Sequence, residues 1–338
     1  MENKFTEFNQ RFHGLLKAAE MPSGQEEIAR GYCGFPIEHD YPALTPSLWN
    51  PIFRKFGRPT RAIMLVGQTD RTKEILDFLK KDEEFQGGGL GVGFKDEAVA
   101  QGALDGLHPL AERIGAANVV AKEEGKLIGY NTDGLGYVRS LQEKMAELGK
   151  DLADTEILIL GAGGTASAIA FTLAGQAKKI TILNRTLSKA EKLYERLTSF
   201  VDTLPESHRT EIEAGDEKEI AGAAAQANVI LNTTLKGATG KFEKFAALSN
   251  TDSAVENLTV SQQVFQSLKR DTLISDVNLT KGDPITVTLA KQYNLPTLDG
   301  RPMVLYQAIE AFWLVNHSWL ETKGVTKEEI EKLMRQTI

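Results

Sequence analysis

Apolar residues along the chain fall into two repeating patterns. Residues 72–79 and 137–148 have the spacing of amphipathic helices. Short apolar runs predict buried strands instead. These runs occur at 62–66, 90–94, 156–160, 180–184, 228–232 and 273–277. Strands that alternate with helices in this way are typical of α/β folds.

The first 30 residues carry a different signal. Their aromatic and aliphatic side chains lie on one stripe of a helical projection: Phe5, Phe8, Phe12, Leu15 and Leu16. We therefore predict an amphipathic helix, packed against its own domain. An alternative use of the same stripe is contact between subunits.

Length and composition are those of a globular protein with two domains. Of the 338 residues, 41% are hydrophobic and 25% are charged, which excludes a disordered chain. A net charge of -7 leaves no basic stripe for a nucleic acid. We expect neither a membrane span nor a signal peptide. The single cysteine, Cys33, favours a reducing, cytoplasmic compartment.

The most specific local pattern is a glycine-rich turn between a strand and a helix. It contains the candidate cofactor-binding residues Gly161, Gly163, Gly164, Thr165 and Ala166. Gly161 allows the tight turn, Gly163 lets the backbone approach phosphates, and Ala166 is small enough for close helix packing. The free N–H groups at the start of the helix would face the pyrophosphate of a dinucleotide.

The end of the following strand predicts which dinucleotide is bound. Enzymes that prefer NAD usually place an acidic residue there, whereas those that prefer NADP place a cation beside the 2′-phosphate. This strand ends in Asn184, Arg185 and Thr186, without a carboxylate. Arg185 can donate two N–H bonds to phosphate and stack on adenine, and its neighbours add neutral donors. The pattern predicts NADP, unless Arg185 is an ordinary surface arginine.

Several phrases together resemble the shikimate dehydrogenase family and follow one another in the family's order. Besides the glycine turn they are GAANVV at 115–120, GKLIGYNTDG at 125–134, NRT at 184–186 and GRPMVLYQ at 300–307. The resemblance covers nearly the whole chain, and the YNTDG phrase combined with the others is highly specific.

This resemblance implies an α/β fold with two domains. An N-terminal α/β substrate domain would comprise residues 1–136 and 304–338, with C-terminal helices returning to it. Residues 137–303 would form a Rossmann-type doubly wound NADP-binding domain, with the substrate in the cleft. The implied enzyme is an oxidoreductase of aromatic amino acid biosynthesis. It would interconvert shikimate and 3-dehydroshikimate, or quinate and 3-dehydroquinate.

Ketone reduction leaves alkoxide character on the oxygen, so the site needs a proton donor or a cation. The family's catalytic lysine falls on Lys95, at the end of GGGLGVGFK, and its partner aspartate falls on Asp133. As neighbours, they would titrate as a coupled pair and steer a proton to the substrate. Otherwise they would be a solvated strand end and a turn residue. The family's substrate-binding amides fall on Asn118 and Gln307, although Gln307 would also fit an exposed helix position.

Two departures from the family pattern affect the substrate site. The usual Asn, Thr and Pro of the lysine strand are Gly89, Gly91 and Gly93, so a threonine hydroxyl that the family offers to substrate is missing. We expect these glycines to leave space for a larger group or for another side chain.

The second departure lies in the family phrase PIxHSxSP, whose serines hold the substrate carboxylate. Here the chain has PIEHDYPALTP at 36–46. Thr45 matches the second serine, and Asp40 or Tyr41 matches the first. An ionised Asp40 would repel a carboxylate. Either Asp40 points away and Tyr41 donates the bond, or the physiological substrate differs.

The resemblance assigns a further set of residues to the cofactor site: Asn232, Thr233, Thr234, Gly300 and Met303. The last two would line the nicotinamide pocket. The first three would lie beside the cofactor, or would cap the next segment. Lys236, where the family pattern is not followed, would be an extra cation near the cofactor.

Other functions remain as alternatives. The same hydride chemistry would serve another cyclic hydroxy acid or polyol, and a non-catalytic NADP-binding regulator would keep the fold alone. The scattered histidines predict no metal site. We expect a small cyclic hydroxy acid as the partner, no nucleic acid or membrane, and a monomer or homodimer.

Overall fold

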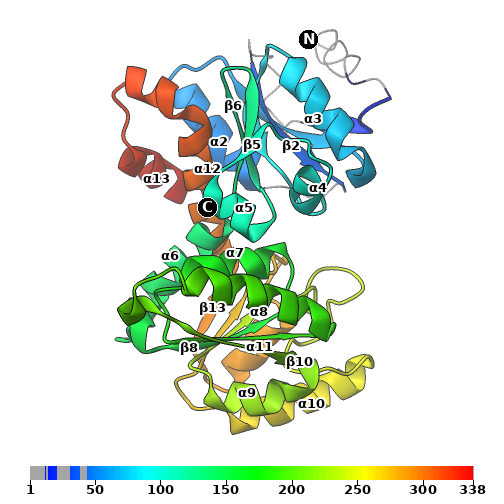
Figure 1. Cartoon of the computed structure of the whole chain (residues 1–338), viewed down its shortest axis with the longest axis vertical. Coiled ribbons are helices and arrows are strands. Elements are labelled where there is room, and N and C mark those ends of the chain that lie inside the picture. The colour runs from blue at the N-terminus through cyan, green and yellow to red at the C-terminus, as the bar shows by residue number, and fades with distance from the viewer. Residues whose placement is uncertain (1–11, 13, 21–30, 39–43, 338) are drawn as a thin grey trace. The chain divides into compact units, whose positions relative to one another are not determined.

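The computed structural model describes residue 12 and residues 14–20, 31–38 and 44–337 (Figure 1). These residues form two compact units, each built on one β-sheet. The first unit comprises the chain up to Asp133 and from Val304 onward, and the second comprises Gly134–Met303. The prediction of an α/β fold is confirmed.

The sheet of the first unit mixes parallel and antiparallel strands, in the order β1-β3-β2-β4-β6-β7-β5. Parallel pairing joins β2 to β3 and β4, and joins β5 to β7. The other neighbours are antiparallel. The strands are β1 (Ala18–Glu20), β2 (Tyr32–Ile37), β3 (Arg61–Val66), β4 (Phe85–Gly89), β5 (Gly106–Leu107), β6 (Val119–Glu123) and β7 (Lys126–Tyr130).

Helices cover both faces of this sheet (Figure 1). They are α2 (Leu44–Lys55), α3 (Thr72–Lys81), α4 (Phe94–Ala100), α5 (Pro109–Ile114), α12 (Arg301–Thr322) and α13 (Lys327–Arg335). One core joins α2, α12 and α13 around the rings of Trp49, Phe53 and Phe312. A second core, around Phe85 and Phe94, buries the apolar stripe of α3. Aromatic burial on both faces therefore fixes the strands whose ends adjoin the candidate site.

The strand predicted at 90–94 is wrong. The structure places β4 at Phe85–Gly89, and the chain then loops until α4 begins at Phe94. Leu90 and Phe94 are buried because they fill the second core from a loop and a helix start. The glycines of β4 give no apolar pattern, yet they are needed there. A Cβ on Gly88 would lie 1.8 Å from the carbonyl oxygen of Gly34 in β2.

The predicted N-terminal helix is wrong for residues 18–20, which form β1 antiparallel to β3. Just before β1, Lys17 N donates to the carbonyl oxygen of Val66 at 2.7 Å, so pairing with an open strand edge replaces helical hydrogen bonds. Phe12 is buried. Phe5 and Phe8 lie outside the described residues.

The sheet of the second unit is entirely parallel, in the order β10-β9-β8-β11-β12-β13. The strands are β8 (Glu156–Leu160), β9 (Lys179–Asn184), β10 (Glu211–Asp216), β11 (Val229–Asn232), β12 (Leu273–Asp276) and β13 (Thr297–Asp299). This is the doubly wound order, whose direction reverses between β8 and β11. A dinucleotide site is expected at the carboxyl ends of these two strands.

The helices of the second unit explain its continuous apolar strands. They are α6 (Asp133–Glu147), α7 (Gly164–Leu173), α8 (Leu187–Val201), α9 (Ile220–Gln226), α10 (Ala254–Ser267) and α11 (Ile285–Gln292). In Figure 1, α7 and α8 cover one face of the sheet, and α9 and α10 cover the other. Strands covered on both faces need apolar residues at every position.

Strand β10 forms an edge of the described sheet. Its Glu211 and Glu213 are exposed, and both pair with Lys179 of β9, at 3.1 and 2.6 Å. Across the described residues, every helix is too short or too polar to span a lipid bilayer.

Candidate active site

A largely buried ion pair lies in the first unit. Lys95 Nζ donates to Asp133 Oδ2 at 2.6 Å. The Asp133 side chain is 2% exposed and that of Lys95 is 22% exposed, so the accessible part of the pair belongs almost entirely to Lys95. Asn118 Nδ2 donates to the other carboxylate oxygen at 2.7 Å. Both oxygens of Asp133 are therefore bonded, which fixes the orientation of the carboxylate.

Backbone contacts bring these residues together from separate elements. Lys95 is the second residue of α4, and its carbonyl oxygen accepts from Ala117 N at 3.1 Å, beside Asn118. Asp133 is the first residue of α6, where the helix dipole favours a carboxylate. Its N–H donates to Asn131 Oδ1 at 3.1 Å. Neither a solvated strand end nor a simple turn describes this geometry.

Two further residues complete a polar cluster, which we define as Lys95, Asn118, Thr132, Asp133 and Gln307. Asn118 Nδ2 donates to Gln307 Oε1 of α12 at 3.3 Å. Thr132 N donates to Asn118 Oδ1 at 2.8 Å, and Thr132 Oγ1 donates to the carbonyl oxygen of Gln307 at 3.2 Å. Sequence reasoning missed Thr132, although it lies within the YNTDG phrase that should have pointed to it.

Side chains of β2 fill the space beside the glycines before Lys95, which is the second of the two alternatives that we expected. A Cβ on Gly91 would lie 2.8 Å from Ile37 Cγ2, and one on Gly89 would lie 2.8 Å from the Phe35 ring. Gly93 has a φ of 87°, which side chains rarely adopt. The physical reason is the close approach of β2, whose side chains fill the space beside β4.

Of the three residues expected to hold a substrate carboxylate, the structure describes Thr45 alone. Asp40 and Tyr41 are outside the described residues. Thr45 is the second residue of α2 and is half-buried. Its proposed contact with substrate remains a prediction.

The glycine turn of the second unit has the geometry of a phosphate site. Gly161 has a φ of 112°, and a Cβ there would lie 2.5 Å from Thr233 Oγ1, so only glycine fits. Gly163 is exposed, and a Cβ there would meet nothing within 4 Å. Ala166 is buried against the sheet. The turn therefore fits a pyrophosphate that approaches the backbone at Gly163.

The start of α7 and the end of β9 both fit their predicted roles in cofactor binding. Gly164 and Thr165 begin α7, whose first N–H groups would face an anion. At the end of β9, Asn184 Nδ2 donates to the carbonyl oxygen of Thr186 at 2.9 Å. Arg185 is exposed, and no hydrogen bond or ion pair joins it to another described residue. Its guanidinium group is therefore available for a 2′-phosphate.

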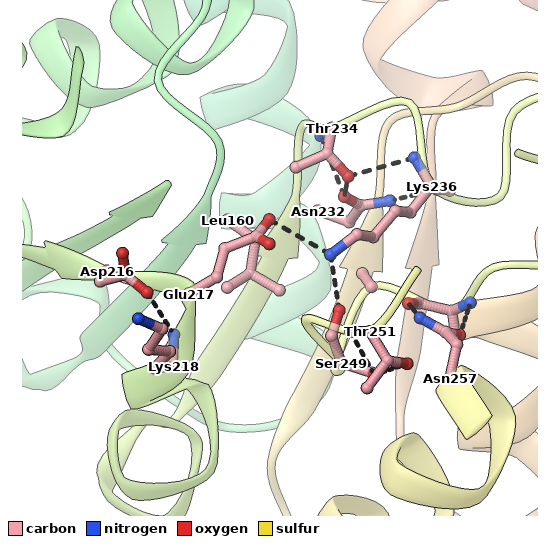
Figure 2. A network of polar contacts seen from close by, with 12 residues as sticks. Leu160, Asp216, Glu217, Lys218, Asn232, Thr234, Lys236, Ser249, Thr251 and Asn257 are labelled. Atoms are coloured by element: carbon pink, nitrogen blue, oxygen red, sulfur yellow. Dashed lines mark hydrogen bonds and ion pairs between the residues drawn. The ribbon is translucent and has the colours of Figure 1, made fainter. Parts of the chain in front are cut away.

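The residues that follow β11 mainly bond to one another (Figure 2). Asn232 Oδ1 accepts from Thr234 N at 2.9 Å and from Thr234 Oγ1 at 2.7 Å. Thr233 Oγ1 donates to the carbonyl oxygen of Leu160 at 2.7 Å. These side chains hold a loop in place, as the capping alternative supposed, and direct contact with a cofactor remains a prediction.

Lys236 is not the extra cation that we expected near a cofactor. Its Nζ donates to Glu217 Oε1 at 3.2 Å and to the carbonyl oxygen of Ser249 at 2.5 Å, as Figure 2 shows. The side chains of Lys236 and Glu217 are 15% and 9% exposed. The ammonium group is therefore neutralised within the protein.

The last two predicted cofactor residues lie where the chain enters α12. A Cβ on Gly300 would lie 2.5 Å from the carbonyl oxygen of Val277, so this position requires glycine. Met303 is 6% exposed. Gly300 thus allows close packing of two loops at the carboxyl edge of the sheet.

Known proteins share this architecture and sequence pattern. A family model described as Shikimate / quinate 5-dehydrogenase matches residues 141–248. An NADP(+)-dependent shikimate dehydrogenase of Bacillus cereus strain AH187 is 31% identical over 83% of this chain and 90% of its own length. The chain belongs to the shikimate dehydrogenase family.

Other members of the shikimate dehydrogenase family match over most of the chain. One from Halothermothrix orenii, also NADP(+)-dependent by name, is 28% identical over 91% of this chain and 95% of its own length. The crystal structure of shikimate dehydrogenase from Aquifex aeolicus aligns with a TM-score of 0.70 and 25% identity. That alignment covers 93% of this chain and all of the other. The resemblance seen in the sequence and the Rossmann-type fold are both confirmed.

Proposed function

We propose that this protein is an NADP-dependent oxidoreductase that interconverts shikimate and 3-dehydroshikimate, or quinate and 3-dehydroquinate. The observation that carries this function is the Lys95–Asp133 pair, buried on its carboxylate side and flanked by two amide side chains. Family members named as NADP(+)-dependent shikimate dehydrogenases support it.

The polar cluster supplies the proton chemistry. Lys95 presents an ammonium group that donates a proton to the oxygen of a bound ketone, or accepts one from the alcohol in the reverse direction. Asp133 orients the ammonium group and stabilises its charge through the 2.6 Å contact. Asn118 and Gln307 bond ring hydroxyls, because an amide both donates and accepts. NADPH, when bound, supplies the hydride.

The second unit binds the dinucleotide. The exposed backbone at Gly163 and the start of α7 receive the pyrophosphate. Arg185 recognises the 2′-phosphate, which makes NADP the preferred cofactor.

A second candidate is the same reaction on another cyclic hydroxy acid or polyol. The absent hydroxyl at Gly91, where Ile37 fills the space, and the acidic Asp40 in the carboxylate-binding phrase favour it. The first feature removes a hydroxyl from the substrate site, and an ionised Asp40 would repel a substrate carboxylate.

Binding and turnover measurements on the full chain test both candidates. NADPH binding is followed by fluorescence, and NADP(+) reduction by absorbance with shikimate, quinate and related polyols. Turnover of shikimate or quinate supports the first candidate, and turnover of another polyol alone supports the second. NADPH binding without turnover of any of these would contradict an oxidoreductase and favour a regulator.

We place this enzyme in the cytoplasm, in keeping with a buried, free Cys33. Sedimentation of the purified protein distinguishes the monomer from the homodimer.

A further inference from the structure

A buried carboxylate lies between two asparagines at the carboxyl ends of β11 and β12. Asp276 ends β12 and is 0% exposed. Its Oδ2 accepts from Asn232 Nδ2 at 2.9 Å. Its Oδ1 accepts from both N and Nδ2 of Asn278, each at 2.9 Å. No ion pair joins it to another described residue. We define Asn232, Asp276 and Asn278 as the clasp.

The clasp holds the loop formed by residues 233–236. The carbonyl oxygen of Lys236 accepts from Asn232 Nδ2 at 2.8 Å and from Asn278 Nδ2 at 3.0 Å. Asn278 Nδ2 also lies 3.0 Å from the carbonyl oxygen of Thr234. Loop carbonyl groups that would otherwise need water are thereby bonded to the side chains of Asn232 and Asn278. The loop has little freedom to change shape.

The far side of the same loop is held as well. Figure 2 shows the Lys236 side chain reaching from the loop to Glu217 and Ser249. Glu217 follows β10, so the contact ties this loop to the end of another strand of the sheet.

The loop in turn abuts the glycine turn. Thr233 N and Oγ1 both donate to the carbonyl oxygen of Leu160, at 2.9 and 2.7 Å, immediately before the turn. A Cβ on Gly161 would lie 2.5 Å from the same hydroxyl oxygen. The position of Thr233 therefore limits the positions that the backbone of the turn can take.

We propose that the clasp is a positioning device for cofactor binding, in which Asn278 and Asp276 keep the glycine turn in its binding shape before the dinucleotide arrives. This role deepens the proposed function, and it rests on the dinucleotide site assigned above. A turn that is already ordered loses less conformational freedom on binding, so affinity is higher.

The substitution Asn278→Ala tests this role, because Asn278 is only half-buried and its described bonds go to the loop and to Asp276. We expect the Kd for NADPH to rise about tenfold, which corresponds to losing about one net hydrogen bond. At saturating NADPH, kcat should stay within about twofold of the unchanged protein, since the polar cluster is intact.

Asn257→Ala is the matched control. Asn257 is buried in α10 and bonds to both N and O of Ala246, at 2.8 and 3.1 Å, without touching the loop at 233–236. It should lower the Tm but leave the Kd for NADPH unchanged. Equal Kd values for Asn278→Ala and the unchanged protein, or equal increases in both variants, would overturn the positioning role. If the unchanged protein binds no NADPH, the proposed function fails instead.

Hydrogen exchange of the unsubstituted protein gives a second measurement that does not depend on a variant folding. The amides of Thr234 and Lys236 should exchange slowly without NADPH, and NADPH should add little protection. Strong protection that appears only with NADPH would show that the loop is ordered by the cofactor, which contradicts a preset turn.

Discussion

Replacing Lys95 with alanine is the most direct test of the proposed chemistry. The substitution removes the ammonium group that lies 2.6 Å from Asp133 Oδ2. Asp133 keeps its bond from Asn118, but its other oxygen loses the partner seen here. A buried carboxylate then remains with half of its hydrogen bonding.

The size of the effect follows from burial. Removing one partner of a fully buried ion pair costs about 3–5 kcal/mol. Lys95 is 22% exposed and water can partly replace it, so we expect a loss of about 2 kcal/mol in the free energy of unfolding. For catalysis, losing a charged group at the reacting oxygen should lower kcat by about 100- to 1,000-fold.

Steady-state kinetics and NADPH titration measure these two effects separately. Lys80→Ala is the control, since Lys80 also forms an ion pair in the first unit, with Asp105 at 2.5 Å, but the two side chains are 38% and 27% exposed. The control should leave kcat unchanged and alter stability by less than about 1 kcal/mol. A fall in kcat of less than about tenfold for Lys95→Ala, or an equal loss of NADPH affinity, would refute the assigned role.

Three further outcomes are expected. Arg185→Ala should weaken NADPH binding by about 10- to 100-fold and NADH binding far less, because only NADPH carries the 2′-phosphate; parallel weakening would contradict that contact. Gly91→Thr should lower the free energy of unfolding by about 1–3 kcal/mol, because its Cβ would lie 2.8 Å from Ile37 Cγ2, and an unchanged Tm would show that β2 yields easily. Burial raises the pKa of Asp276 from 3.8 to about 6, so folding favours its protonated form. The stability that protonated Asp276 gives the folded protein is complete below about pH 3.8 and is lost as the pH rises through about 6. The unfolding free energy of the unchanged protein minus that of Asp276→Asn should therefore fall by about 2 kcal/mol between pH 4 and pH 7, and chemical denaturation at several pH values would reveal a constant difference if this is wrong.

Four strands of the second unit, β8, β9, β11 and β12, could be predicted from their apolar runs, whereas the polar edge strand β10 and the short strand β13 were not predicted. Strand β8 is buried from Ile157 to Leu160 and is a continuous apolar run, and β9 buries Ile180, Ile182 and Leu183; the glycine turn and Asn184 mark where the two strands end. Strand β4 carries the opposite composition, since close packing against Gly34 removes its side chains. Its pattern is therefore missing from the sequence, and the apolar residues beyond it were mistaken for the strand.

The polar cluster could be predicted from the sequence, whereas the contacts of the loop after β11 could not. Lys95 and Asp133 lie in phrases that resemble a known family, so their proximity could be expected before any coordinates. The direction of Lys236 could not be expected, because its partner Glu217 lies 19 positions away in another connection. Whether a surface cation turns inward depends on the backbone path of both loops, which local residue patterns do not encode.

The outermost strand of the second sheet has a consequence for handling the protein. An unpaired strand edge offers N–H and C=O groups to any neighbouring chain, and β10 is such an edge in the described sheet. Glu211 and Glu213 share one cation, Lys179, so this edge keeps a net negative charge that repels a second copy of itself. Acid or high salt weakens this repulsion, so concentrated solutions of the protein should be most prone to self-association under those conditions.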